Sequence, residues 1–200
     1  TFTGLQAILN AHEKGNVTNP LDIRLLGILH KENIERCGSA NTIVLNNDPK
    51  DISKAFPEFF DMVLCDAPCS GEGMFRKEDQ AVEQWSLENV QACASRQLCI
   101  LDEAYKCLKP GGTMVYSTCT FALEENEMCM KKFMQEHPDM HLVPIEVDFG
   151  RKAFDLGSHT DYARRIIPID SGEGHFIAKL QKDVTSTEST VKLMQSQALP

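Results

Sequence analysis

Long hydrophobic runs are missing from this sequence, and no apolar segment approaches the roughly 20 residues that span a bilayer. The opening TFTGLQAILNAHEKG has no basic region, apolar stretch and small-residue cleavage site of the kind that directs export. Positive charge is also scarce, because 20 Lys and Arg stand against 29 Asp and Glu, giving a net charge of −9. We therefore expect a cytoplasmic protein without membrane contact that does not hold nucleic acid by overall charge.

The eight cysteines lack the spacing of a zinc site, since Cys65 and Cys69 have no second pair to complete four ligands. We predict no metal. Without an export signal, the cysteines are expected to be free thiols. Four of them fall on helix faces or at helix ends and are predicted to be small core residues: Cys37, Cys93, Cys99 and Cys107.

Two hundred residues suffice for one domain, and apolar strand-like runs alternate with amphipathic segments along it. Helices are predicted over 5–15, 20–38, 87–108 and 124–136, and strands over 42–46, 59–66, 113–119, 142–147 and 174–180. This alternation predicts an α/β fold whose ligands bind beyond the carboxyl ends of the strands. The Ser/Thr/Gln-rich residues 183–200 are expected to be a linker or disordered tail after a domain over 1–182.

Two loops that follow predicted strands each contain a cysteine, Cys69 in one and Cys119 in the other. If the strands are parallel neighbours, both thiols face one cleft with Asp66 between them. Because Cys119 precedes a predicted helix, the helix N-terminus is expected to lower its pKa. Two other interpretations remain open: both cysteines are core residues, or they form a redox disulfide, which requires Cα atoms within about 7 Å.

The run DAPCSGEGMFRKE at 66–78, followed by Trp85, Gln97 and the run LKPGGTMVYSTCTFALEENE at 108–127, closely resembles the Nol/Nop/Sun family of RNA cytosine-5 methyltransferases. The similarity is greatest to the bacterial branch that modifies small-subunit ribosomal RNA, and it covers most of residues 14–181. It implies the class I, Rossmann-like fold of S-adenosylmethionine-dependent methyltransferases, with a doubly wound, mostly parallel sheet.

The resemblance also implies roles for the loop residues. Cys119 would add as thiolate to C6 of the cytosine, which activates the weakly nucleophilic C5. Asp66 would hydrogen-bond the N3 edge of the base, and Cys69 would help to release the enzyme after methyl transfer from S-adenosylmethionine.

Further contacts are predicted around this centre. Phe75, Arg76 and Lys77 could stack on a neighbouring base and contact phosphate of an RNA whose target base is flipped out, although Phe75 fits the core equally well. Cofactor contacts are expected from four residues: Asp66, Pro68, Asp48 and Asp22. Asp48 could reach the adenine edge or simply form a turn, and Asp22 is the carboxylate nearest to the usual ribose-binding position.

The chain departs from the family pattern at its start. Members carry a strand and a glycine-rich turn ahead of the segment where this chain begins, so the first strand is expected to be missing and the domain to be N-terminally truncated. We therefore expect weak S-adenosylmethionine binding, and RNA affinity that resides largely outside these residues.

Several alternatives are left open. A DNA cytosine-5 methyltransferase would use Cys69 as nucleophile, and a transfer-RNA cytosine methyltransferase would share the chemistry of Cys119. The chain could also be a catalytically silent module that binds RNA or protein, or a thiol-redox protein. Nothing in the pattern sets an oligomeric state, and a monomer is favoured.

Overall fold

The computed structural model describes residues 5–8, 25–27, 42–45, 47–170 and 172–184. The strands are β1 Leu5–Ile8, β2 Leu25–Gly27, β3 Thr42–Val44, β4 Phe60–Asp66, β5 Leu108–Thr118, β6 Met140–Leu142, β7 Arg151–Lys152, β8 Arg164–Ile166 and β9 His175–Lys182. The helices are α2 Pro49–Ala55, α3 Asp79–Gln84, α4 Leu87–Cys107 and α5 Glu127–Glu136, with 3-10 turns at Glu72–Met74, Thr160–Tyr162 and Pro168–Asp170. No described helix is both long and apolar enough to cross a bilayer.

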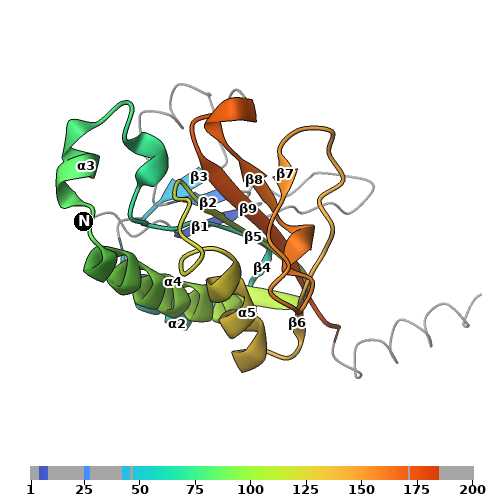
Figure 1. Cartoon of the computed structure of the whole chain (residues 1–200). Helices are drawn as coiled ribbons and strands as arrows, with labels where there is room; N and C mark the ends of the chain where they lie inside the picture. Colours follow the sequence, from blue (N-terminus) through green and yellow to red (C-terminus); the bar gives the residue numbers. More distant parts are fainter. Residues whose placement is uncertain (1–4, 9–24, 28–41, 46, 171, 185–200) are drawn as a thin grey trace, which may run out of the picture.

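The strands form one mixed sheet in the order β3-β2-β1-β4-β5-β9-β8-β7, with β6 paired to β9. The pairs β2–β3 and β4–β5 are parallel, and the remaining pairs among the described strands are antiparallel. Figure 1 shows α4 and α5 together on one face of this sheet. Because β4 and β5 are parallel neighbours, the loops that follow them leave the sheet at the same edge.

The first part of the sheet differs from the sequence-based expectation. Leu5–Ile8 lies between β2 and β4 as a strand antiparallel to both, so the helix predicted over 5–15 is wrong there. The helix predicted over 20–38 is likewise wrong at Leu25–Gly27, which is strand β2. Short apolar segments fit either period, and pairing partners distant in sequence decide between them. The first strand of the family pattern was expected to be missing. Strand β1 lies beside β4 and runs antiparallel to it.

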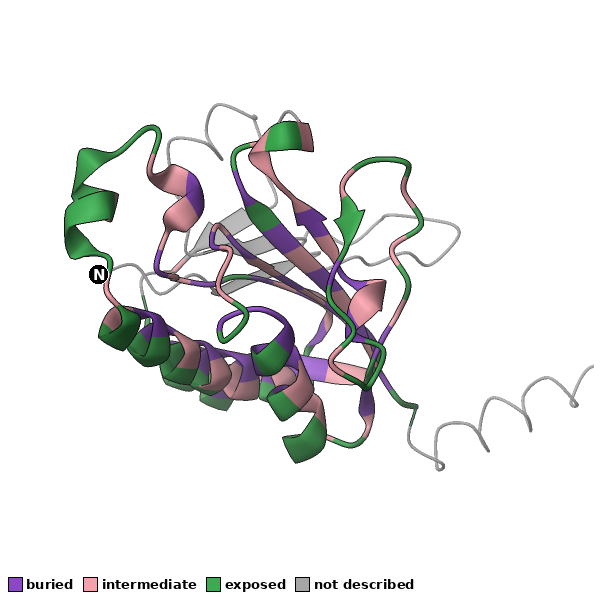
Figure 2. Ribbon diagram, in the orientation of Figure 1, coloured by how far each residue is buried: buried purple, intermediate pink, exposed green. Residues whose placement is uncertain are grey.

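Helix α4 forms where its period predicts it. The Ser86 hydroxyl accepts a hydrogen bond from the backbone N–H of Asn89 and caps the first turn, and Lys106 suits the negative end of the helix dipole. The helix turns one stripe of residues toward the sheet and leaves the opposite stripe exposed (Figure 2). The helix ends at Cys107, close to the end predicted at 108. The Lys-Pro-Gly-Gly sequence, which was expected to separate helix and strand, instead lies within β5, which begins at Leu108 and not at 113.

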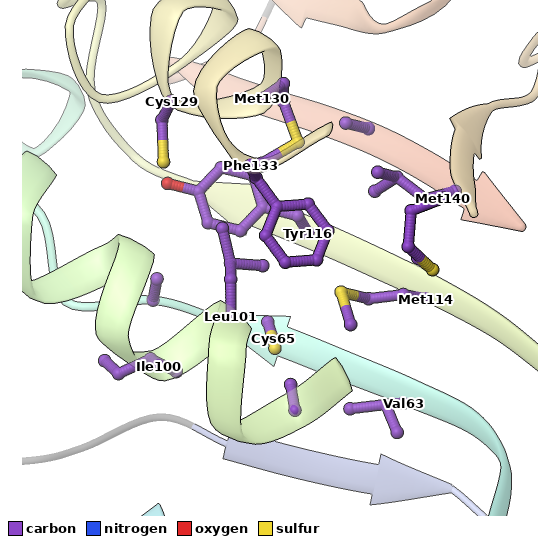
Figure 3. Close-up of a cluster of buried hydrophobic side chains, with 14 of the residues drawn as sticks. Val63, Cys65, Ile100, Leu101, Met114, Tyr116, Cys129, Met130, Phe133 and Met140 are labelled. Carbon is purple, nitrogen blue, oxygen red and sulfur yellow. The ribbon is translucent and has the colours of Figure 1, made fainter. Parts of the chain in front are cut away.

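The core lies between the sheet and helices α4 and α5. Tyr116 on β5, Leu101 on α4 and Phe133 on α5 are at most 1% exposed, and Figure 3 shows them packed together. Aromatic and aliphatic side chains of this size bury enough apolar surface to fix the helices on the sheet. The layers therefore hold the carboxyl edge of β4 and β5 rigidly.

Other expectations have mixed outcomes. Strand β9 confirms the prediction over 174–180, whereas the strand predicted over 142–147 is wrong beyond Leu142, because β6 ends there. Cys93 and Cys107 are buried as predicted, but Cys99 is exposed. Cys37 lies outside the described residues, as does the predicted tail from 185 onward; the domain boundary at 182 stays a prediction.

Candidate active site

The two cysteine loops meet beyond the ends of β4 and β5. Parallel pairing sets Asp66 opposite Ser117, the last β4 residue beside the end of β5. The sulfur atoms of Cys69 and Cys119 then lie 3.1 Å apart, and the backbone N–H of Cys119 points to the Cys69 sulfur at 3.3 Å. The predicted proximity of the two thiols is confirmed.

Direct hydrogen bonds tie the loops to each other. The N–H of Gly73 donates to the carbonyl of Cys119 at 2.8 Å, and the hydroxyls of Ser70 and Thr120 are 2.8 Å apart. A Cβ at Gly73 would stand 2.9 Å from that carbonyl oxygen and 2.6 Å from the carbonyl oxygen of Gly174. Only glycine therefore permits this approach of the two backbones.

Glu72 is a residue of this site that the sequence analysis missed. Its carboxylate accepts hydrogen bonds from the N–H of Phe121 at 2.8 Å, the hydroxyl of Thr120 at 3.1 Å and the indole of Trp85 at 3.0 Å. An acid between two glycines in a loop is typical of a solvated turn, so nothing local marked it. Here it connects the loop after β4 to the residues that follow Cys119.

The sulfur contact separates the two thiols electrostatically. A hydrogen bond from Cys69 lowers the pKa of Cys119, while the same contact and burial raise the pKa of Cys69. Of the two thiols, Cys119 therefore loses its proton more readily, and thiolate character is what makes a cysteine nucleophilic. The pKa of Cys119 is lowered as expected, but its largest cause is the hydrogen bond from Cys69, and α5 begins at Glu127, three residues after the start predicted at 124.

Asp66 ends β4 as an exposed side chain and accepts a hydrogen bond from the Ser117 hydroxyl at 3.0 Å. Its negative charge raises the pKa of Cys119 and so opposes the effect of the hydrogen bond from Cys69. An exposed carboxylate at this edge can accept hydrogen bonds from a base, from ribose hydroxyls or from an ammonium group.

The other predicted cofactor contacts are less complete. Asp48 caps α2 through a hydrogen bond from the N–H of Lys50 at 2.9 Å, so its carboxylate serves the turn that was the alternative interpretation. Pro68 is half-buried beside Cys69, and Asp22 lies outside the described residues. Asp66 and Pro68 thus suit a cofactor bound at this edge, and the described residues supply only part of such a site.

The three predicted RNA contacts follow the 3-10 turn at Glu72–Met74 and precede α3. Phe75 is half-buried and packs edge-on against Trp85, with ring centroids 6.5 Å apart. Arg76 and Lys77 are exposed, and Lys77 forms an ion pair with Glu173. Phe75 therefore combines both interpretations, with part of its ring packed and part accessible. Within the described ranges no cluster of ligands could hold a metal ion, and the described cysteines are free.

The model of a family described as 16S rRNA methyltransferase RsmB/F matches residues 12–181 of this chain. Curated relatives called ribosomal RNA small subunit methyltransferase F, from Pectobacterium atrosepticum and Serratia proteamaculans, are 36% identical over 180 residues. These alignments cover 90% of this chain and 37% of each relative. The chain thus spans little more than a third of the length of these relatives.

Solved structures give the same similarity. A methyltransferase homolog protein from Pyrococcus horikoshii is 31% identical with a TM-score of 0.63, over 75% of this chain and 48% of that one. NSun6 from Pyrococcus horikoshii, solved with SFG, is 30% identical with a TM-score of 0.62, over 76% of this chain and 37% of that one. The predicted class I, Rossmann-like methyltransferase fold is confirmed.

Proposed function

The chain belongs to the RsmB/F family of 16S rRNA methyltransferases, and from this membership we propose that it carries the catalytic centre for S-adenosylmethionine-dependent methylation of cytosine C5 in RNA, ribosomal RNA above all. The observation that carries this proposal is the 3.1 Å contact between the sulfurs of Cys69 and Cys119. A pair of thiols with opposed pKa shifts at the carboxyl edge of the sheet suits a reaction that must form and then break a carbon–sulfur bond.

In the proposed reaction the Cys119 thiolate adds to C6 of a flipped cytosine, and the C5–C6 double bond opens toward C5. A proton shared between the Asp66 carboxyl group and N3 neutralises the negative charge that accumulates at this edge of the adduct, and it leaves N3 again when the adduct breaks down. C5 then forms its bond to the transferred methyl group. The C5 proton passes to solvent, its bonding electrons re-form the C5–C6 double bond, and the C6–S bond breaks so that Cys119 leaves as a thiolate. The Cys69 thiol, in contact with that sulfur, assists its departure by donating a hydrogen bond to it.

S-adenosylmethionine supplies the methyl group when it is bound. A solved relative carries SFG, an analogue of this cofactor, which supports its use here. Asp66 and Pro68 would hold it at the end of β4, and Asp48 and Asp22 are the further contacts we propose. The free thiols fit a reducing cytoplasm, where this reaction would take place.

Phe75, Arg76 and Lys77 are proposed to hold the RNA next to the flipped base. The exposed part of Phe75 can stack on a neighbouring base, and the two exposed cations can contact phosphate. Because the net charge is −9, such local contacts rather than the overall charge would guide RNA to this loop.

The test is covalent trapping on small-subunit ribosomal RNA in the presence of S-adenosylmethionine. Cys69→Ala should accumulate a protein–RNA species that resists denaturation, and the double variant with Cys119→Ala should form none. An adduct that persists in the double variant, or that depends on Cys69 in place of Cys119, would contradict the assignment. The second outcome would match the chemistry of DNA cytosine-5 methyltransferases.

A further inference from the structure

Both peptide groups that flank Cys69 are held by buried side chains from elsewhere in the chain. On one side, the carbonyl of Pro68 accepts a hydrogen bond from Nε2 of Gln97 at 3.0 Å. On the other, the N–H of Ser70 donates to the carboxylate of Glu125 at 3.0 Å. Nε2 of Gln97 also donates to that carboxylate at 2.8 Å, which joins the two supports.

Glu125 is itself fixed to the core. The backbone carbonyl oxygen of Glu125 accepts a hydrogen bond from the hydroxyl of Tyr116 at 2.7 Å, and both residues are 0% exposed. Gln97 is equally buried on α4. The support of Cys69 therefore rests on β5, on α4 and on the segment that follows Cys119, three parts of the chain that the core holds together.

Burial of a carboxylate group costs free energy because the group loses its hydration. Burial raises the pKa of Glu125, and the hydrogen bonds from Ser70 and Gln97 oppose that shift. Carboxylate hydrogen bonds are stronger and more directional than those of neutral acceptors, so they fix a backbone more closely. Catalytic groups must be held to within about 0.5 Å, and an acceptor fixed in the core can hold the peptide group of Ser70 to such a tolerance.

We propose that Glu125 is a positioning residue of the cysteine pair, which with Gln97 fixes the peptide groups on both sides of Cys69 and so keeps its sulfur in contact with that of Cys119. The placement stands on geometry, and only its purpose in release of the enzyme rests on the proposed function. Nothing in this assignment requires Glu125 to touch cytosine or methyl donor.

The experiment measures how strongly the fold brings the two sulfurs together. In a glutathione redox buffer the two thiols give up two protons and two electrons to form a disulfide, and oxidised glutathione becomes two molecules of reduced glutathione. The equilibrium gives the effective concentration of one thiol at the other, read by mass spectrometry of the peptides with Cys69 and Cys119. The readout needs neither RNA nor S-adenosylmethionine, so it is independent of methyl transfer.

Glu125→Ala removes the acceptor for Ser70 and should lower the effective concentration roughly ten- to a hundredfold, the range expected when a reacting group moves by about 1 Å. Glu125→Gln keeps a carbonyl acceptor at the same place but forms weaker hydrogen bonds, so its effective concentration should lie between those of the parent chain and Glu125→Ala. Glu124→Ala, a change at the exposed neighbouring acid, is the matched control and should have no effect.

Thermal unfolding of each variant separates position from stability. A merely structural role predicts a lower melting temperature for Glu125→Ala with an unchanged effective concentration, and that result would overturn the proposal. The proposal would also be overturned if Glu125→Gln lowered the effective concentration as much as Glu125→Ala does. If Glu125→Ala does not fold, Gln97→Met is used in its place, because it removes the hydrogen-bond donor to Pro68 and Glu125. An unchanged effective concentration in Gln97→Met would then overturn the proposal.

Discussion

The buried ion pair between Arg165 and Glu127 should be among the most sensitive points of the fold. Nε of Arg165 donates to Oε1 of Glu127 at 2.6 Å, and Nη2 bonds the other oxygen. The side chains are 8% and 0% exposed. Nη1 of Arg165 also donates to the carbonyl of Phe121 at 3.0 Å, which lies close to Cys119 along the chain.

Arg165→Met keeps an apolar stem of similar length but leaves the Glu127 carboxylate buried without its cation. Removal of one partner from a buried pair costs about 3–5 kcal/mol. With a urea m-value of about 2 kcal/mol/M, the midpoint of unfolding should fall by roughly 1.5–2.5 M. That is a large part of the 5–15 kcal/mol typical of a domain, so the variant should be only marginally folded.

The assay is urea unfolding followed by circular dichroism, with Arg151→Met as matched control. Arg151 pairs with Asp170 at 3.1 Å but is 56% exposed, so its loss should cost less than about 1 kcal/mol. The double variant Arg165→Met with Glu127→Met removes the stranded charge and should be more stable than Arg165→Met alone. The reasoning is refuted if Arg165→Met costs no more than the control, or if the second substitution destabilises further.

Three further outcomes are expected. Cys69→Ala should move the midpoint pH for iodoacetamide alkylation of Cys119 upward, because the sulfur contact that lowers the Cys119 pKa is lost, and Cys69→Ser, which keeps a donor, should move it less. Burial raises the pKa of Glu125, so the protonated side chain stabilises the fold at a pH below its unfolded pKa, and this stabilisation is lost as the pH rises through its folded pKa. Glu125→Gln cannot ionise, so the melting temperature of this variant relative to that of the parent should rise between pH 4 and pH 8. Gly73→Ala should destabilise by about 1–3 kcal/mol in urea unfolding, because its Cβ would meet the carbonyl oxygens of Gly174 and Cys119; an unchanged midpoint would contradict that contact.

The sulfur contact could be predicted because the signals for it are local. The run from Phe60 to Asp66 and the run from Thr113 to Thr118 are apolar enough to identify buried strands, and each is followed directly by its cysteine. Parallel neighbours deliver their loops to one edge, so the proximity of Cys69 and Cys119 required one further assumption, that the two strands are parallel neighbours, which the pairing of β4 with β5 confirms.

The supports of this contact could not be predicted because their partners are far away in sequence. Arg165 stands beside Arg164 in the sequence and reads as a solvated basic pair, yet its partner Glu127 is 38 residues distant and fully buried. Glu125 sits in a run of acids that is typical of an exposed helix start. Only packing shows which of these charges face inward, since propensity and period carry no information about distant partners.

Strand β1 illustrates the same limit in the backbone. The segment LQAI has apolar residues that suit either a helix or a strand, and the helical interpretation was wrong because β2 and β4 supply hydrogen bonds on both sides. Its antiparallel direction leaves its amino end beside the carboxyl end of β4, since Leu5 pairs with Cys65. The edge at which we propose that the cofactor binds is thus bordered by the start of this strand.

Loop length at the ends of β4 and β5 decides whether the two sulfurs can cooperate. The strand register places Asp66 opposite Ser117, and short loops carry the chain from there to Cys69 and Cys119. One inserted residue can shift a sulfur by about 3.3–3.6 Å, which exceeds the whole 3.1 Å contact. The strands would pair unchanged after such an insertion, because their register is set by the buried core. The core could therefore keep its fold while the thiols lost contact, so the exact spacing from strand end to cysteine, rather than the fold, limits the chemistry.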